Sequence, residues 1–96
     1  MAQDGDLVAV GVRDRMPAIG DPSPRDYVVV PRHAAFATSP PAHLVLGDTS
    51  YRLQDEGTDG WVARGLDLER DGRFLAEVVL TDGRELPVVV EVSTVQ

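Results

Sequence analysis

The chain has 96 residues, of which 16 are acidic and nine are basic, so its formal net charge is −7. This length is enough for a single domain, 1–96, that buries roughly 60 to 65% of its unfolded surface. An acidic chain without a basic cluster is not expected to bind nucleic acid or an anionic membrane surface.

Cysteine is absent, which removes disulfides, thiolate catalysis and cysteine-based zinc sites. No run approaches 18 apolar residues, and the start, 1–6, is acidic where a signal peptide would be basic. We therefore expect a cytoplasmic protein. Fifteen valines stand against five aromatic residues, and long helix-forming runs are missing, so the composition favours β-strands.

The first half of the chain predicts two short strands joined by a long loop. Valine at every second position predicts a strand over 6–12. The segment 13–26 contains three prolines and no sustained period, so we expect a loop there. The apolar run 27–30, stopped by a proline, is typical of a strand buried on both faces.

The middle of the chain predicts a second loop and a hairpin. In 31–43, alanines support one helical turn before two consecutive prolines end it. Strands over 44–46 and 51–53 flank a Gly-Asp-Thr-Ser sequence at 47–50, which predicts a tight hairpin.

The last third, 60–92, organises the predicted fold. Three apolar runs are separated by two similar turns at 70–72 and 81–83, and this pattern predicts a three-stranded β-meander. Treating each turn as a three-residue loop, closed by a glycine in the left-handed conformation, places the even-numbered side chains on one inner face.

This register predicts specific neighbours within the meander. Phe74 is expected opposite both Leu68 and Val90 in one inner row. Pro87 is expected in a non-hydrogen-bonded pair with Glu77, with its nitrogen pointing away from the central strand. The last strand is therefore expected to be a sheet edge, at least locally.

Together these elements predict an all-β domain. We expect a small antiparallel barrel or a two-sheet sandwich of about six strands, with the C-terminal three-stranded meander as its nucleus.

The sequence contains no motif for catalysis, metal binding or nucleotide binding. No serine lies in a nucleophile-elbow context, and His33 and His43 lack a metal-binding spacing. The segment 55–60 resembles the head of a calcium loop, but the twelfth position is Leu66, where a glutamate is needed. Glycine-rich phosphate-binding strings are also missing. We therefore expect a protein that is not an enzyme and has no cofactor or metal.

Two arginines form the first set of candidate binding residues. Arg64 is expected opposite Val78 and Arg84 opposite Leu80, so that two guanidiniums share one end of the inner face. They would form an anion or carboxylate pocket at a barrel mouth. The alternative is that both stems cover apolar surface while the charged groups reach water.

The second set lies on the outer face, where Leu75 and Val89 are expected to be neighbours, with Val79 nearby and Trp61 toward one end. A joined apolar patch beside an edge strand favours a partner surface or a self-association face. The alternative is that the N-terminal strands cover it.

These features favour a non-enzymatic protein-interaction module that binds a protein or peptide through an edge strand or the proline-rich loops. The alternatives are a small structural subunit of a larger assembly, of the virion or secretion type, and an acidic immunity or inhibitor protein. The expected partner is another protein or a second copy, and neither nucleic acid nor a membrane.

Overall fold

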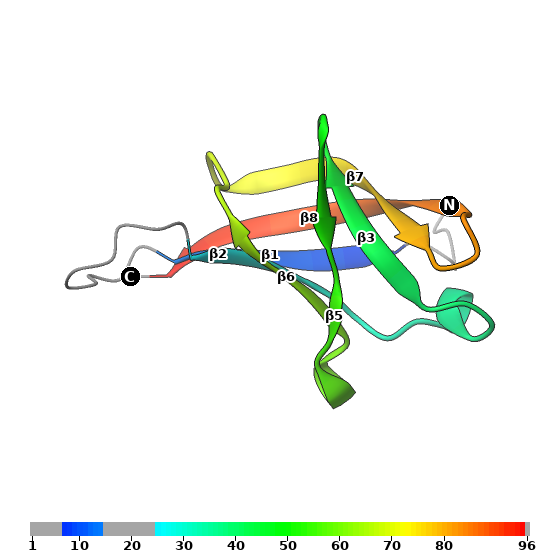
Figure 1. Cartoon of the computed structure of the whole chain (residues 1–96). Helices are drawn as coiled ribbons and strands as arrows, with labels where there is room; N and C mark the ends of the chain where they lie inside the picture. Colours follow the sequence, from blue (N-terminus) through cyan, green and yellow to red (C-terminus); the bar gives the residue numbers. More distant parts are fainter. Residues whose placement is uncertain (1–6, 15–24, 96) are drawn as a thin grey trace, which may run out of the picture.

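The computed structural model describes residues 7–14 and 25–95. These residues form eight strands and two short 3₁₀ helices (Figure 1). In chain order, the elements are β1 (Val8–Asp14), β2 (Asp26–Val30), η1 (Ala34–Phe36), β3 (Pro41–Leu46), β4 (Thr49–Arg52), β5 (Gln54–Asp55), η2 (Gly57–Asp59), β6 (Trp61–Leu66), β7 (Gly72–Leu80) and β8 (Glu85–Val95).

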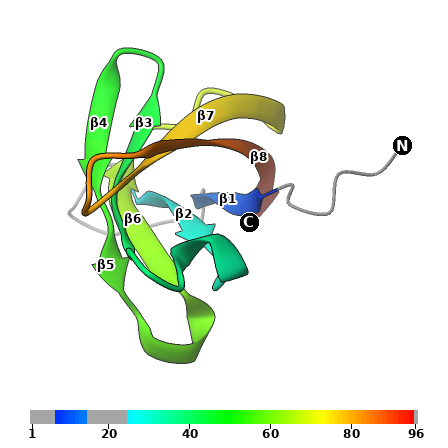
Figure 2. The same ribbon diagram turned by 90° about the vertical axis from the view of Figure 1, so that its right-hand side faces the viewer.

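All eight strands belong to one sheet, in the order β4-β3-β7-β8-β1-β2-β6-β5. Neighbouring strands are antiparallel, except that β1 and β8 run parallel. Figures 1 and 2 show that the sheet curls into a nearly closed barrel. The prediction of a small all-β barrel is confirmed, with more strands than expected and without a second sheet.

The two ends of the sheet are consecutive in the chain. β4 lies at one end and β5 at the other, and only Leu53 separates them. The N–H of Leu53 donates to the carbonyl oxygen of Ala42 at 2.9 Å, and the Leu53 side chain is buried. One bent strand therefore joins both ends and brings the barrel close to closure.

The hairpin formed by β7 and β8 has the predicted register. Phe74 pairs with Val90, and the other pairs of the two strands keep the same register. The N–H of Leu80 donates to the carbonyl oxygen of Arg84 at 2.8 Å, which closes a three-residue loop. The last loop residue, Gly83, has a φ of +95°, as a glycine in this position was predicted to have.

Pro87 has the predicted position opposite Glu77. β8 as a whole is not an edge, because it lies between β7 and β1. Pairing between β8 and β1 begins only at Val89, opposite Val8, two residues after the proline. Within residues 7–14 and 25–95 no strand pairs with β8 on this side at Pro87, so its missing N–H removes no hydrogen bond of the described ladders.

The other half of the predicted meander is wrong. β6 pairs with β2 and β5 and not with β7. Leu68 is buried and Phe74 packs against the core, but they are not strand partners. The chain instead leaves β6 at Leu66 and crosses through 67–71 to a different part of the sheet.

A β-bulge explains this difference. Tyr27 pairs with Arg64 and Asp26 pairs with Leu66, so Gly65 is an extra residue on β6, with a φ of +78°. An extra residue shifts the alternation by one position. Odd-numbered residues of β6 therefore face the core before the bulge and even-numbered residues face it afterwards, whereas the prediction used the even-numbered pattern throughout.

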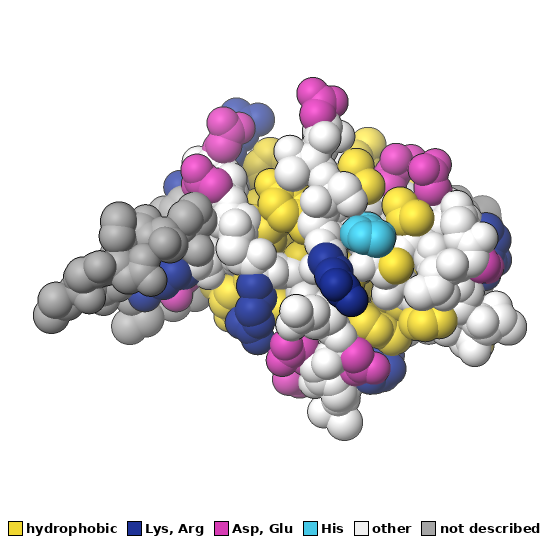
Figure 3. All heavy atoms as spheres, viewed as in Figure 1, with side chains coloured by type: hydrophobic (Ala, Val, Ile, Leu, Met, Phe, Trp, Pro, Cys, Tyr) yellow, Lys and Arg dark blue, Asp and Glu magenta, His cyan; other side chains and the backbone are white. Residues whose placement is uncertain are grey.

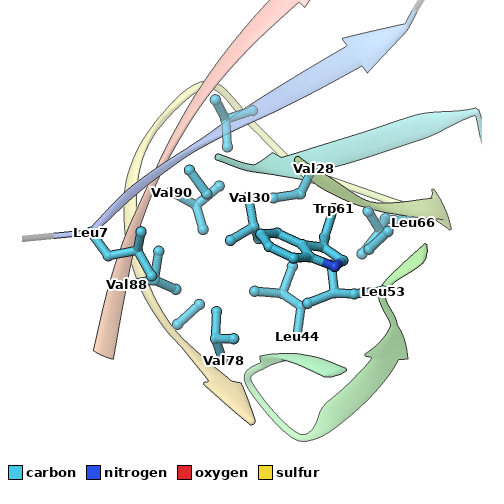
Figure 4. Packing of buried hydrophobic residues seen from close by; sticks show 14 of the residues in the cluster. Leu7, Val28, Val30, Leu44, Leu53, Trp61, Leu66, Val78, Val88 and Val90 are labelled. Carbon is cyan, nitrogen blue, oxygen red and sulfur yellow. The ribbon is translucent and has the colours of Figure 1, made fainter. Parts of the chain in front are cut away.

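This shift places Trp61 inside the barrel, where 7% of it is exposed, and not on the outer face as predicted. Figure 4 shows the indole ring among core side chains that include Val30 and Leu44. The Phe36 ring packs edge-on against it at 5.3 Å, and the Arg32 guanidinium lies 4.6 Å from its centroid. The single tryptophan is thus a central part of the core.

The first two strands differ from prediction in two ways. β1 continues to Asp14, beyond the predicted end at position 12, and 15–24 of the predicted loop lie outside the described residues. In β2, Val28 and Val30 are fully buried, but Tyr27 and the residues that share its face are only half-buried. The prediction that this strand is buried on both faces is therefore wrong.

The middle of the chain follows the prediction closely. The helical turn is η1, and the hairpin forms between β3 and β4. β3 begins earlier than expected, at Pro41, and the hairpin loop is shorter, because Leu46 already pairs with Thr49. The loop contains only Gly47 and Asp48, and only the glycine has positive φ, as a type II′ turn requires.

Substitution of Gly60 tests the close contact between the residue that follows η2 and the end of β2. Its φ is +108°, and a Cβ atom at this position would lie 2.2 Å from the carbonyl oxygen of Val30. We expect Gly60→Ala to lower the free energy of unfolding by about 2 kcal/mol or more, because backbone strain and overlap act together. Urea unfolding followed by Trp61 fluorescence measures this loss.

Gly57→Ala is the matched control. Gly57 also has positive φ, at +74°, but nothing lies within 4 Å of the added carbon. We expect a loss of about 1 kcal/mol from conformational strain alone. Equal losses in the two variants would contradict the close approach of Gly60 to β2.

Candidate functional site

Arg64 lies on the outside of the barrel and not on the inner face. It precedes the bulge, pairs with Tyr27 across the β2–β6 ladder, and its side chain is 60% exposed. Its guanidinium lies 3.4 Å from a carboxylate oxygen of Glu56 and 5.7 Å from the Tyr27 ring centroid. The predicted position opposite Val78 is therefore wrong.

Arg84 lies in the turn between β7 and β8, where it binds Asp82. Its Nε donates to one carboxylate oxygen at 2.8 Å, and its backbone N–H donates to the other at 2.9 Å. The backbone hydrogen bond first, and then the guanidinium, hold the pKa of the Asp82 carboxyl below its ordinary value. Each of the two predicted arginines thus has its own acidic neighbour, and the geometric basis for a shared anion pocket is lost.

The outer positions predicted on β7 and β8 are where the sequence placed them. Leu75 pairs with Val89, and Val79 faces the same side four residues along β7. Leu75 is 80% exposed, while the two valines are half-buried. Trp61, the fourth residue predicted for this surface, lies in the core.

β1 and β2 extend this surface in a way that the sequence did not indicate. Val89 pairs with Val8 on β1, which is 40% exposed. Val10, which is 49% exposed, lies two residues further along on the same side and pairs with Val29 on β2. We call this surface the outer apolar face and define it by five residues: Val8, Val10, Val29, Leu75 and Val89.

The outer apolar face is not covered by the N-terminal strands. β1 and β2 belong to the same sheet and continue it beyond β8, so they enlarge this surface. Arg73 and Glu91 form an ion pair across β7 and β8, in the row of the ladder that continues to Val10. The surface therefore combines exposed apolar side chains with an internal pair of opposite charges.

A shallow groove of about 500 Å³ adjoins this face over β1, β2 and β6. Valine and tyrosine side chains make its apolar part, and charged side chains from η2, its flank and β6 make the polar part. Its lining residues are Val10, Tyr27, Val29, Glu56, Asp59, Val62 and Arg64.

A second groove has a volume of about 320 Å³. It lies between the β3–β4 hairpin and the segment that follows β6, where Figure 3 shows hydrophobic side chains beside the hairpin. We call it the seam groove, and it is lined by Leu46, Gly47, Tyr51, Leu66, Asp67, Leu68, Glu69, Phe74 and Leu75.

Asp26 fixes one wall of the seam groove. It is fully buried, and its two carboxylate oxygens accept the N–H of Leu68 at 2.7 Å and the N–H of Asp14 at 2.9 Å. The carboxylate thus ties the segment after β6 to the end of β1 and the start of β2. No motif in the sequence marks Asp26, and its only signal is an acidic side chain directly before an apolar strand.

The histidines do not lie in a metal-binding arrangement in the described part of the chain. His43 is exposed on β3, and the His33 ring packs edge-on against Phe36 at 6.1 Å. Within residues 7–14 and 25–95, no three histidine, aspartate or glutamate side chains gather as metal ligands would. The same residues contain no helix of the length and apolar character needed to span a membrane.

Comparison with known proteins gives no relative. No protein-family model matches the chain, and no curated protein or solved structure matches it. The outer apolar face and the seam groove are therefore interpreted from their own chemistry.

The Asp82 turn gives a pH-dependent prediction. Because the pKa of Asp82 is lower in the folded chain, its carboxylate stabilises the fold above the unfolded-state pKa, and this contribution is lost as pH falls through the folded-state pKa. Arg84→Gln removes the guanidinium but keeps the backbone N–H, so we expect the pKa to rise only part of the way. Carboxyl ¹³C NMR titration measures it, with Arg52→Gln as a control of equal charge change. An unchanged pKa in Arg84→Gln would show that the guanidinium contributes nothing.

A second prediction concerns Asp26. Asp26→Asn keeps one acceptor but turns an amide N–H₂ toward one of the two backbone donors, which then lacks a partner. We expect the free energy of unfolding to fall by about 1–3 kcal/mol and amide exchange at Leu68 to become faster. The exposed Asp67→Asn is the control, with an expected change within about 0.5 kcal/mol. Equal stability of the two variants would refute the role of Asp26.

Proposed function

We propose that the protein is a non-enzymatic interaction module that binds a protein partner through the outer apolar face. One observation carries this proposal. The large hydrophobic residues that are exposed in the described chain are Val8, Val10 and Leu75, and they lie on one surface, on the two strands that flank β8. Scattered exposed hydrophobic residues are ordinary, but a joined group on one surface is typical of a contact with another molecule.

The chemistry of the surface fits this role. An interface usually combines an apolar centre with polar groups that fix the orientation of the partner. Leu75 is 80% exposed, and its burial by a partner would contribute about 1.5–2 kcal/mol. The Arg73–Glu91 ion pair offers both a donor and an acceptor beside it.

A second copy of the chain is the alternative partner for the same surface. That arrangement corresponds to the small structural subunit expected as an alternative from the sequence. An acidic immunity or inhibitor protein would be a special case of the proposed module, in which the outer apolar face binds a different protein. A cytoplasmic location, the lack of enzymatic activity and the lack of nucleic-acid binding remain predictions.

Photo-crosslinking in the organism that encodes the protein tests the proposal. A photoreactive amino acid is placed at Val10 or Leu75, with the exposed Thr38, in the loop after η1, as the control position. We expect a discrete product with a different protein from positions 10 and 75, and no such product from position 38. A product formed only between copies of this chain would favour the structural-subunit alternative and overturn the proposal.

Surface substitution gives a quantitative check. Leu75→Ser and Val10→Ser remove exposed apolar side chains, so each is expected to change the free energy of unfolding by no more than about 0.5 kcal/mol. Each is expected to weaken crosslinking from the other position, because both side chains would be buried by the same partner. Undiminished crosslinking from position 10 in Leu75→Ser and from position 75 in Val10→Ser would contradict binding through this face.

A further inference from the structure

The backbone of β4 offers unused hydrogen-bonding groups along one edge. The N–H of Leu53 donates to β3, and the ladder alternates, so Tyr51 is the next residue whose backbone groups point to β3. The N–H and C=O groups of Ser50 and Arg52 therefore point away from β3. β4 is the last strand at its end of the sheet, so no strand of the described chain pairs on that side.

The facing edge of β6 is also open. Its pairing with β5 covers only Trp61 and Val62, and the next residue oriented toward that side is Arg64. The β2 ladder continues past the bulge at Gly65 only to Leu66, where β6 ends and the chain passes into 67–69. β4 and β6 thus diverge from the bend at Leu53, and they leave a seam in the barrel wall with an unpaired edge on either side.

Apolar side chains fill the floor of this seam. Leu46 and Tyr51 from the hairpin and Phe74 from β7 are partly buried and pack against the core. Leu66 and Leu68, from the opposite wall, are buried core residues. The interior of the barrel therefore reaches the surface at the seam groove, and side chains that enter the groove would join the core.

The rim of the groove carries negative charge. Asp67 and Glu69 alternate with the buried leucines of this wall, and both are exposed. Neither has an ion-pair partner within the described residues, and the described lining of the groove includes no basic residue. The nearest neighbour in sequence with positive charge, Arg70, lies over the Phe74 ring at 5.7 Å.

We propose that the seam binds an extended segment of a partner protein, which adds as a β-strand along the free edge of β4. Alternate side chains of this segment are apolar and enter the seam groove. The side chains between them face solvent, and one of them is basic and lies beside Asp67 and Glu69. Main-chain hydrogen bonds to Ser50 and Arg52 supply affinity, and the groove and the carboxylates supply selectivity.

This site shares Leu75 with the outer apolar face and has no other residue in common with it. Leu75 lies at the rim of both surfaces, so it is left unchanged in the test. Loss of binding at the seam would leave crosslinking from Val10 unaffected, and the two proposals can fail independently.

Three capped hexapeptides serve as probes: acetyl-TVRVTV-amide, the acidic acetyl-TVEVTV-amide and the polar acetyl-TSRSTS-amide. Titration is followed by ¹⁵N NMR of the full chain. We expect TVRVTV to shift the amides of Ser50 and Arg52 and to protect them from exchange. The acidic and polar peptides are expected to bind at least about tenfold more weakly, because they lose the charge pairing or the apolar contacts.

Two sets of variants test the mechanism. Ser50→Pro removes the outward N–H and puts a ring in its place, while Ser50→Ala keeps the backbone donor. A proline is tolerated on the outer side of an edge strand, and Trp61 fluorescence verifies that both variants are folded. We expect Ser50→Pro to abolish binding of TVRVTV and Ser50→Ala to retain it. Replacing Asp67 and Glu69 with Asn and Gln is expected to remove the preference for TVRVTV over TVEVTV.

Several results would overturn the proposal. Equal binding by Ser50→Pro and Ser50→Ala would exclude strand addition at β4. A preference for TVEVTV would exclude recognition of a basic side chain. Peptide-induced shifts confined to Val8 and Val10 would place binding on the other surface. Protection of Ser50 that depends on protein concentration, without peptide, would assign the seam to a second copy of this chain.

Discussion

The architecture depends on one additional residue in β6. Gly65 has no partner across the β2 ladder, and its positive φ allows the strand to bend where a residue with a side chain would be strained. Because the alternation shifts at this point, Trp61 and Leu66 can both face the core although they are five positions apart. The chain leaves the sheet one residue after this bulge, at Leu66, and does not pair with β7. The position of the tryptophan and the open seam therefore have a common origin.

Only a short segment of the chain closes the barrel. The bend at Leu53 lets one strand pair with β3 before it and with β6 after it, so both ends of the sheet are linked by a single residue. Because β4 pairs only with β3 and β5 pairs only with β6, each half of this bent strand has one edge without a partner strand. Natural sheets usually shorten or cover such edges. Here β4 is short, but the groove beside it continues directly into the core.

Local patterns in the sequence predicted local structure well. The loop at 81–83, the pairing of Phe74 with Val90 and the place of Pro87 all follow from turn chemistry and alternation within about 20 residues. The errors arise from long-range contacts. Turn-forming residues at 70–72 resemble those at 81–83, yet the strands before and after them join different neighbours.

In the candidate surfaces too, positions set by local contacts were predicted correctly and positions set by long-range contacts were not. Leu75 and its partner on β8 were placed correctly, because one hairpin determines their side of the sheet. Val8 and Val10 join the outer apolar face because the first and last strands pair in parallel. The short-range periodicity of the sequence contains no signal for this pairing. The role of Asp26 depends on two backbone donors from distant segments. Trp61 was misplaced because Gly65 shifts the alternation by one position, and the signal of this shift, the charged Arg64 directly before it, was assigned to the inner face.

The parallel pairing of β1 with β8 also determines how the chain can acquire its structure during synthesis. Arg13 donates to the hydroxyl of Thr94 at 3.2 Å across a separation of 81 residues, and β8 is the last of the eight strands to leave the ribosome. Contacts between such distant residues carry a large loop-closure entropy and are typical of slow-folding topologies. The nascent chain therefore has no complete wall until β8 emerges, and the barrel can form only after that point.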